Sequence, residues 1–296
     1  FSINARSFPS GTILIFRSEN EKAGKNIIST IAKVQKEKNT VFHPVTTGSV
    51  KNGDNLGSRV YSRLVAPRIA VASGVETSPQ GVGEVMHLFE QELQHPVTAI
   101  GVQQLSELNI NKVDVLILPD GNYGNAINEK VEHWISAGGK LILMENAITS
   151  ILGKKPFNIK LKDLVETPQY ESALAKHEDK NKESHSNAIP GAIFKVELDT
   201  DHPINAGLGK YYYALKTDDR IYDLSSSFVN TGTLKKNSYI AGIAGKNVLR
   251  KLDNGMLFGV QKVGKGSIIY LGSDVLFRSF WESGKQMFIN AAFLVH

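Results

Sequence analysis

The chain has 296 residues, of which 41% are hydrophobic and 21% are charged, and its net charge is +5. This composition is typical of a globular protein that buries a hydrophobic core. The sequence contains no cysteine, which excludes disulfides, cysteine-ligated metal sites and thiolate catalysis. Its basic residues are spread along the chain without a dense stripe, so we expect no nucleic-acid binding.

Two features of the sequence bear on where the protein resides. No apolar run approaches the roughly 20 residues that a helix needs to cross a membrane, so we expect no membrane span. The chain begins at Phe1 without an initiator methionine. We therefore expect it to be a fragment of a longer protein, and the lack of a visible signal peptide says nothing about export.

The first 65 residues predict a small β-α-β unit. A short apolar strand is expected at 12–16 and a second one at 40–45. Between them, apolar residues recur at helical spacing with lysines on the opposite face. We place the domain boundary after this unit, so that residues 1–65 form the N-terminal unit and residues 66–296 form the main domain.

The main domain opens with alternating strands and helices. Strands are predicted at 68–73, 96–100, 113–118 and 140–144, and amphipathic helices are predicted at 78–93 and 125–137. Such alternation is typical of an α/β fold with a doubly wound, mostly parallel sheet.

The second half of the main domain is less regular. Residues 152–190 break the pattern, and the charged stretch at 171–186 predicts an exposed excursion. Further strands are expected at 193–198, 211–215, 239–243, 256–260 and 267–271. A hairpin turn around Gly264 joins the last two strands, and an apolar helix at about 277–294 ends the chain.

Small and polar residues follow three of the predicted parallel strands, at the edge where open α/β sheets bind ligands. We predict a strand-end binding pocket from these residues: Ser73, Gly74, Asp120, Gly121, Asn122, Glu145 and Asn146. Asp120 and Glu145 could act there as an acid/base pair. The alternative, which we favour, is that Asp120 and Asn146 cap helices and Gly121 permits a turn.

One spacing resembles a metal site. His87 and Glu90 match the H-x-x-E pattern of a carboxypeptidase zinc site, but a pattern with two fixed positions arises easily by chance. Both residues lie in a predicted amphipathic helix, and the sequence marks no third ligand, because His177, His185 and His202 fall in predicted loops. We therefore predict no metal site in this chain and read His87 and Glu90 as ordinary helix residues.

Several blocks of the sequence, in order, carry a resemblance to a known family. They include Asn52-Gly-Asp-Asn-Leu-Gly-Ser58 and Asp114-Val-Leu-Ile-Leu-Pro-Asp-Gly121, together with residues 66–70, 83–93, 95–98, 189–194, 198–203, 277–281 and 288–293. These blocks resemble the C-terminal half of large bacterial zinc carboxypeptidases of the carboxypeptidase A-like type. In those proteins a class I glutamine amidotransferase-like domain, with a flavodoxin-like sheet, follows the catalytic domain.

The resemblance implies a domain without chemistry of its own. The family's zinc ligands belong to the upstream domain, so zinc is expected only there and no cofactor is expected here. Amidotransferase-like domains place a nucleophilic Cys after the strand corresponding to 140–144, where this chain has Glu145, Asn146 and Ala147. We expect a noncatalytic accessory domain that packs on the upstream carboxypeptidase domain or binds its peptide substrate. Its expected location is periplasmic or extracellular.

Two alternatives to this expectation stay open. The first is an independent hydrolase that uses Asp120 and Glu145 in the strand-end pocket. The second is a module that binds small molecules or peptides through an aromatic surface formed by Tyr211, Tyr212, Tyr213, Phe280 and Trp281.

Overall fold

The computed structural model describes residues 1–3, 6–9, 11–23, 26–58, 61, 63–106, 112–163 and 185–295. The chain divides into two compact units, Phe1–Arg63 and Leu64–His296. The predicted excursion at 171–186 lies outside the described residues except for its last two positions. Every helix in the described ranges is too short or too polar to cross a membrane.

The N-terminal unit differs from its prediction. It contains a two-residue antiparallel pair, β1 (Ser2–Ile3) with β2 (Arg6–Ser7), a 3₁₀ segment η1 (Ser18–Ala23) and helix α1 (Asn26–Lys38). The β-α-β prediction is wrong, because residues 12–16 and 40–45 pair with no other strand. An isolated strand is unstable without a hydrogen-bonded neighbour and a core to cover its apolar face. Here Ile13 and Val41 are 64% and 68% exposed, and α1 buries no side chain.

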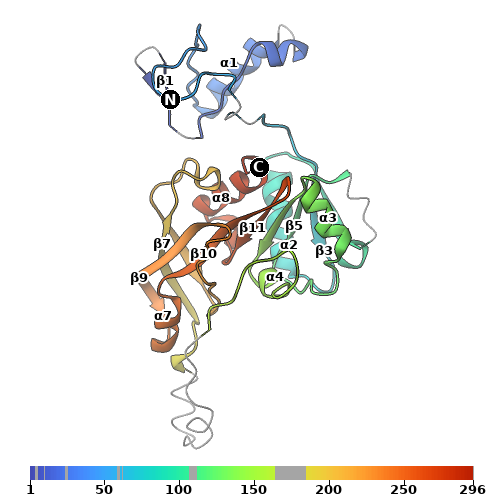
Figure 1. Ribbon diagram of the computed structural model, residues 1–296, viewed down its shortest axis with the longest axis vertical. Helices are drawn as coiled ribbons and strands as arrows, with labels where there is room; N and C mark the ends of the chain where they lie inside the picture. Colours follow the sequence, from blue (N-terminus) through green and yellow to red (C-terminus); the bar gives the residue numbers. More distant parts are fainter. Residues whose placement is uncertain are drawn as a thin grey trace, which may run out of the picture. The chain divides into compact units, whose positions relative to one another are not determined.

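The main unit is built on one nine-stranded sheet with the order β4-β3-β5-β6-β11-β10-β9-β7-β8 (Figure 1). Its first five strands pair in parallel. They are β4 (Val97–Gly101), β3 (Ile69–Ser73), β5 (Val115–Leu118), β6 (Lys140–Met144) and β11 (Gly266–Leu271). The central three are apolar and almost wholly buried, as strands covered on both faces should be. The predicted α/β fold with a doubly wound, mostly parallel central sheet is therefore confirmed.

Four further strands extend this sheet in antiparallel fashion, so the sheet as a whole is mixed. They are β10 (Gly255–Val263), β9 (Val229–Ile243), β7 (Gly191–Leu198) and β8 (Tyr211–Lys216). The predicted hairpin between β10 and β11 is present, with Gly264 at a φ of +59° in its turn. β9 is longer than predicted and shifts register against both β10 and β7, which bends this half of the sheet.

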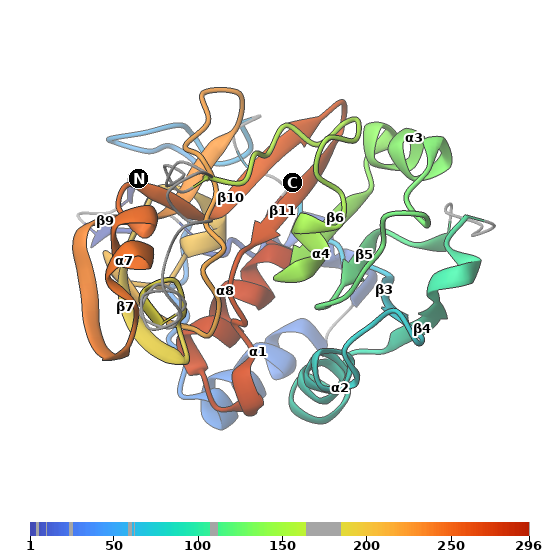
Figure 2. The same ribbon diagram turned by 90° about the horizontal axis from the view of Figure 1, so that it is seen from below.

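Helices cover both faces of the parallel strands, as Figure 2 shows for α2 and α3. Successive strand residues point to opposite faces, so that Ile69 and Val71 join one core cluster while Ala70 and Ala72 join the other. The first cluster is completed by α2 (Pro79–Met86), the π-helical turn η2 (His87–Glu92), α7 (Lys246–Leu252) and α8 (Glu282–Phe293). The second is completed by α3 (Glu129–Ala137) and α4 (Asn146–Thr149). Short 3₁₀ segments lie at η3 (Val102–Gln104), η5 (Pro203–Asn205) and η6 (Phe277–Ser279).

Candidate functional site

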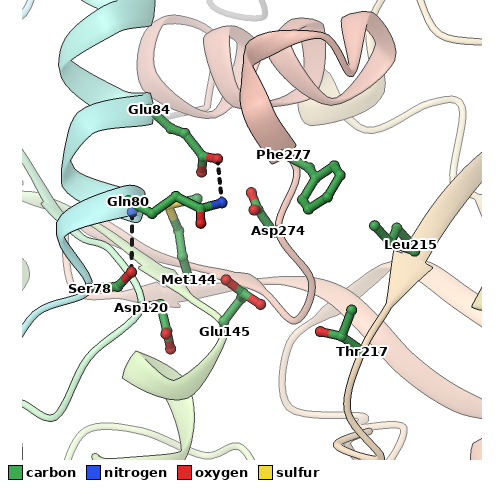
Figure 3. Close-up of a pocket in the computed structure, with 11 residues that line it drawn as sticks. Ser78, Gln80, Glu84, Asp120, Met144, Glu145, Leu215, Thr217, Asp274 and Phe277 are labelled. Atoms are coloured by element: carbon green, nitrogen blue, oxygen red, sulfur yellow. Dashed lines mark hydrogen bonds between the residues drawn. The ribbon is translucent and has the colours of Figure 1, made fainter. Parts of the chain in front are cut away.

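A cavity of about 230 Å³ lies at the carboxyl end of the parallel strands (Figure 3). Helix α2, the ends of β5, β6 and β8, and the segment after β11 all contribute to its walls. The described residues that line it are Ser78, Gln80, Gly81, Glu84, Asp120, Met144, Glu145, Leu215, Thr217, Asp274 and Phe277. Four of them carry carboxyl groups, and none is Lys, Arg or His.

The bend of the sheet completes this cavity. Strand β8 is the outermost strand of the antiparallel half, four strands away from β11 in the order. Even so, Leu215 near its end and Thr217 just beyond it line the same cavity as Glu145. Figure 3 shows these two side chains across the cavity from α2. The antiparallel half therefore supplies a wall that the parallel strands alone would lack.

Glu145 lies in the sharp turn from β6 to α4. Its backbone has φ of +47° and ψ of −116°, a region that a residue with a Cβ rarely adopts. Holding a side chain in such a conformation costs roughly 1–3 kcal/mol, which the surrounding structure must supply. The backbone N–H of Glu145 donates a 2.9 Å hydrogen bond to the carbonyl of Leu271, which fixes the turn to β11. Strained strand-to-helix turns of this kind present nucleophiles in hydrolases, but here the side chain is a carboxylate.

The carboxyl groups of the cavity repel one another and are poorly solvated. Burial, followed by the charges of Asp274, Asp120 and Asp218, raises the pKa of Glu145 to about 8 against the opposing effect of Arg220. Burial, followed by the nearby Glu84, raises the pKa of Asp274 to about 7. Both groups therefore hold protons at neutral pH to an extent that ordinary carboxyl groups do not.

Asp120 has a structural partner. Its Oδ1 accepts a 3.1 Å hydrogen bond from the backbone N–H of Asn146, at the start of α4. Its backbone carbonyl also accepts a 2.7 Å bond from the N–H of Ser78, the N-cap of α2. Asp120 thus ties together the starts of two helices, in agreement with the capping role that we favoured from the sequence. The same prediction is wrong for Asn146, which is the first residue of α4 and whose side-chain oxygen accepts a hydrogen bond from Arg220 instead.

A buried ion cluster lies next to the cavity. Lys216 Nζ and Arg220 Nη2 lie 3.1 Å and 2.7 Å from the two carboxylate oxygens of Asp218. Burial alone would raise the pKa of Asp218, but Lys216 and Arg220 lower it below its ordinary value. Arg220 also donates a 2.9 Å bond to the side-chain oxygen of Asn146. Lys216 and Arg220 are therefore already paired with protein groups.

The structure separates the predicted site residues into two groups. Asp120 and Glu145 line the cavity, whereas Ser73, Gly74, Gly121, Asn122 and Asn146 are not among the residues that line it. Gly121 instead forms a bridge with Thr77, and a Cβ at this position would come within 2.6 Å of the carbonyl oxygen of Glu76. Backbone contact thus explains this glycine without a ligand.

Sequence reasoning missed several residues of the cavity. Asp274 comes shortly after β11, just as Glu145 comes after β6. A polar residue after an apolar strand was therefore the sequence feature that could have identified Asp274 as a cavity residue. Glu84 interrupts the apolar stripe of α2 and is only 7% exposed, which is unusual for a glutamate. Phe277 falls within the helix predicted at the end of the chain, but that helix begins later, at Glu282.

The zinc-like spacing does not form a site. His87 Nδ1 lies 3.3 Å from Glu92 Oε1 on a half-exposed helix surface, and Glu90 is exposed. Within the ranges that the structure describes, no group of three or more His, Asp or Glu side chains is arranged to hold a metal ion.

Comparisons with known proteins bear on the fold. No family model and no curated protein sequence matches the chain. Among solved structures, it is similar to a candidate GMP synthase protein from Thermoplasma acidophilum (11% identity, 78% of this chain and 94% of that chain, TM-score 0.49). It is also similar to a glutamine amidotransferase from Thermotoga maritima (10% identity, 77% and 96%, TM-score 0.44). A third likeness is to an exo-β-1,4-mannosidase from Opitutaceae bacterium strain TAV5 (13% identity, TM-score 0.44), which covers 77% of this chain and only 36% of that enzyme. All three likenesses have TM-scores below 0.5 and concern the fold alone.

Proposed function

We propose that this chain is a noncatalytic module that serves a zinc carboxypeptidase-like protein as an accessory domain. The observation that carries the proposal is the side chain at the β6–α4 turn. Glu145 occupies the position where an amidotransferase-like enzyme needs its nucleophilic Cys, and the sequence has no Cys elsewhere. The carboxypeptidase parent rests on the sequence resemblance alone.

The chemistry of the cavity supports the proposal that the β6–α4 turn carries no catalytic nucleophile. A nucleophile needs an adjacent base or a lowered pKa to attack an amide. The pKa of Glu145 is raised to about 8 instead, chiefly by burial, so its carboxyl is largely protonated at neutral pH. Among the described residues that line the cavity there is also no histidine to act as a base. The cavity is therefore better suited to binding than to attack on an acyl group.

An activity assay of the chain tests the proposal. We expect no release of C-terminal amino acids from a peptide panel in the presence of added Zn²⁺, and no ammonia from glutamine. The matched control is Glu145→Gln, which should give the same background as the wild type. Zinc-dependent release of C-terminal residues above that background would overturn the proposal.

A second candidate function is an independent hydrolase that uses Asp120 and Glu145. Their presence in one cavity, with a raised pKa for Glu145, favours it, because general acid catalysis needs a carboxyl that stays protonated near pH 7. The hydrogen bond from Asn146 to Asp120 Oδ1 speaks against it, since it commits one oxygen of Asp120 to a helix cap. Hydrolysis of any substrate that both Glu145→Gln and Asp120→Asn abolish would favour the hydrolase.

A further inference from the structure

The cavity continues into a row of side chains along β8. Alternate residues of a strand share a face, so Tyr211, Tyr213 and Leu215 point the same way. Leu215 lines the cavity, while Tyr213 and Tyr211 lie progressively farther from it and are 49% and 45% exposed. The row therefore runs outward from the cavity along the edge strand of the sheet.

Three aromatic rings from the segment after β11 lie beside β8. Phe277, Phe280 and Trp281 contact one another with ring centroids 5.7–6.4 Å apart. Trp281 Nε1 donates a 2.9 Å hydrogen bond to the carbonyl of Tyr213, which holds the rings against β8. Phe277 lines the cavity, and Phe280 is 56% exposed. We call Tyr211, Tyr213, Phe277, Phe280 and Trp281 the aromatic surface. Tyr212, which we expected from the sequence to belong to it, is buried in the core at 2% exposure.

The cavity and the far end of β8 differ in charge. The cavity end has four carboxyl groups and no cation among its described lining residues. At the far end, the ammonium groups of Lys195 and Lys210 lie 4.9 Å and 5.5 Å from the centre of the Tyr211 ring. From Leu215 to Tyr211 the strand advances four residues, roughly 13 Å at the usual rise of a β-strand.

The apolar parts of the cavity walls also limit which ligands can fill the cavity. Met144, Leu215 and Phe277 supply apolar surface beside the carboxyl groups. A long side chain with methylene groups and a terminal cation would contact both kinds of surface, since Lys and Arg bury their stems against apolar groups. Such a cation would also favour the ionised forms of Glu145 and Asp274, whose pKa values are raised by burial and by neighbouring carboxyl groups.

We propose that the cavity binds a lysine or arginine side chain of an extended peptide, whose following residues lie on the aromatic surface. A carboxyl group about four residues from the basic residue would then reach Lys195, whereas Lys210 is already paired with Glu197 at 3.6 Å. A free amine or a metal ion would occupy the cavity but leave the aromatic surface uncovered. The inference rests on the proposed function as a binding module and names the chemistry of its ligand.

Isothermal titration calorimetry with designed peptides tests the proposal. The probe is an N-acetylated, C-amidated hexapeptide with Arg at position 2, Tyr at position 4 and Glu at position 6. The control peptide has citrulline in place of Arg, which keeps the shape and removes the charge. We expect the citrulline peptide to bind at least about tenfold more weakly, because hydrogen bonds to charged groups are the stronger ones. Equal affinity for the two peptides, or no binding of the Arg peptide, would overturn the proposal.

Variants locate the binding site on the protein. Glu145→Gln should weaken binding of the Arg peptide, whereas Glu129→Gln on the exposed surface of α3 should not. Thr217→Arg places a guanidinium at the exposed rim of the cavity and should abolish binding, while Thr217→Gln should retain it. Thermal unfolding of each variant shows that loss of binding does not reflect loss of the fold. Unchanged binding by folded Thr217→Arg would contradict the assignment.

The outcomes separate this proposal from the proposed function. Binding of the Arg peptide followed by its cleavage would refute the noncatalytic role and support the ligand class. Absence of both binding and cleavage would refute the ligand class and leave the noncatalytic role standing. A soluble oligosaccharide that binds, with no affinity for the Arg peptide, would assign the aromatic surface to a sugar and overturn the proposal.

Discussion

The carboxyl group of Glu84 accepts a 2.8 Å hydrogen bond from the backbone N–H of Arg278, which joins α2 to the segment after β11. Arg278 and Ser279 both have positive φ values, +49° and +55°, which residues with a Cβ seldom adopt. The next residue toward the N-terminus, Phe277, forms a wall of the cavity. A buried carboxylate thus holds the strained turn that positions this wall.

Replacing Glu84 should therefore destabilise the protein. Glu84→Ala leaves the Arg278 N–H without its acceptor, and the loss should be about 1–3 kcal/mol in the free energy of unfolding. Glu84→Gln keeps a carbonyl acceptor and should lose less. Urea denaturation measures both, with the exposed Glu90→Ala as the control that should stay within about 0.5 kcal/mol of the wild type. A loss no larger than that of the control would show that the bond does not hold the turn.

The sharp β6–α4 turn at Glu145, which we call the elbow, predicts that glycine is more stabilising there than alanine. At an ordinary helix position Ala is more stabilising than Gly by about 1 kcal/mol. At φ +47° and ψ −116° glycine is free of the strain that a Cβ causes, so Glu145→Gly should be more stable than Glu145→Ala. The same pair of substitutions at Glu132 on α3 should show the normal order. A normal order at both positions would mean that the elbow is not strained.

The raised pKa values of Glu145 and Asp274 predict that stability falls as pH rises between about 5 and 8. In this range both carboxyls hold more protons in the folded state than in the unfolded chain, where their pKa values are ordinary. The unfolding free energy then decreases as pH rises. For each group the decrease is at most about 1.4 kcal/mol per unit of difference between its folded and unfolded pKa values. The stabilisation is complete below the unfolded pKa and is lost as pH rises through about 7 and 8.

Urea denaturation at pH 5.5 and pH 8.0 measures this dependence. Glu145→Gln removes one of the two groups, so its stability should fall less over the same interval than that of the wild type. A wild-type stability that rises from pH 5.5 to 8.0 would contradict the electrostatic description of the cavity.

The buried Lys216 predicts strong coupling to Asp218. The Lys216 side chain is fully buried, so Asp218→Asn leaves a cation without its partner, at a cost of about 3–5 kcal/mol. Lys216→Met removes the charge and should cost less. In a double-mutant cycle, the variant with both changes should be less destabilised than the sum of the two single variants. Additive losses would show that the two side chains do not interact.

The parallel half of the sheet could be predicted because its signals are local. Strand β6 was predicted with the bounds Lys140–Met144 that the structure has, since a strand covered on both faces gives a continuous apolar run, here residues 141–144. The N-terminal unit could not be predicted in this way. Its short apolar runs at 12–16 and 40–45 look like strands, but strand formation depends on a pairing partner that the run itself does not encode. Helix α7 (Lys246–Leu252) was missed because it is short and its apolar positions are few.

The candidate site was predicted only in part, for a topological reason. Asp120 and Glu145 follow strands that are close in sequence, so their meeting at one edge could be inferred from the alternation of strands and helices. Asp274 follows β11, and the sequence around β11 predicts only that this strand forms a hairpin with β10. The parallel pairing of β11 with β6 is a long-range contact, as is the bend that brings Thr217 into the cavity.

The most direct test of the noncatalytic account is to incubate the chain with Zn²⁺ and a form of the Arg peptide whose C-terminal carboxylate is free, and to measure the intact peptide by mass spectrometry. The account predicts the same complete recovery for the wild type and for Glu145→Gln. Cleavage by the wild type that disappears in Glu145→Gln would contradict it.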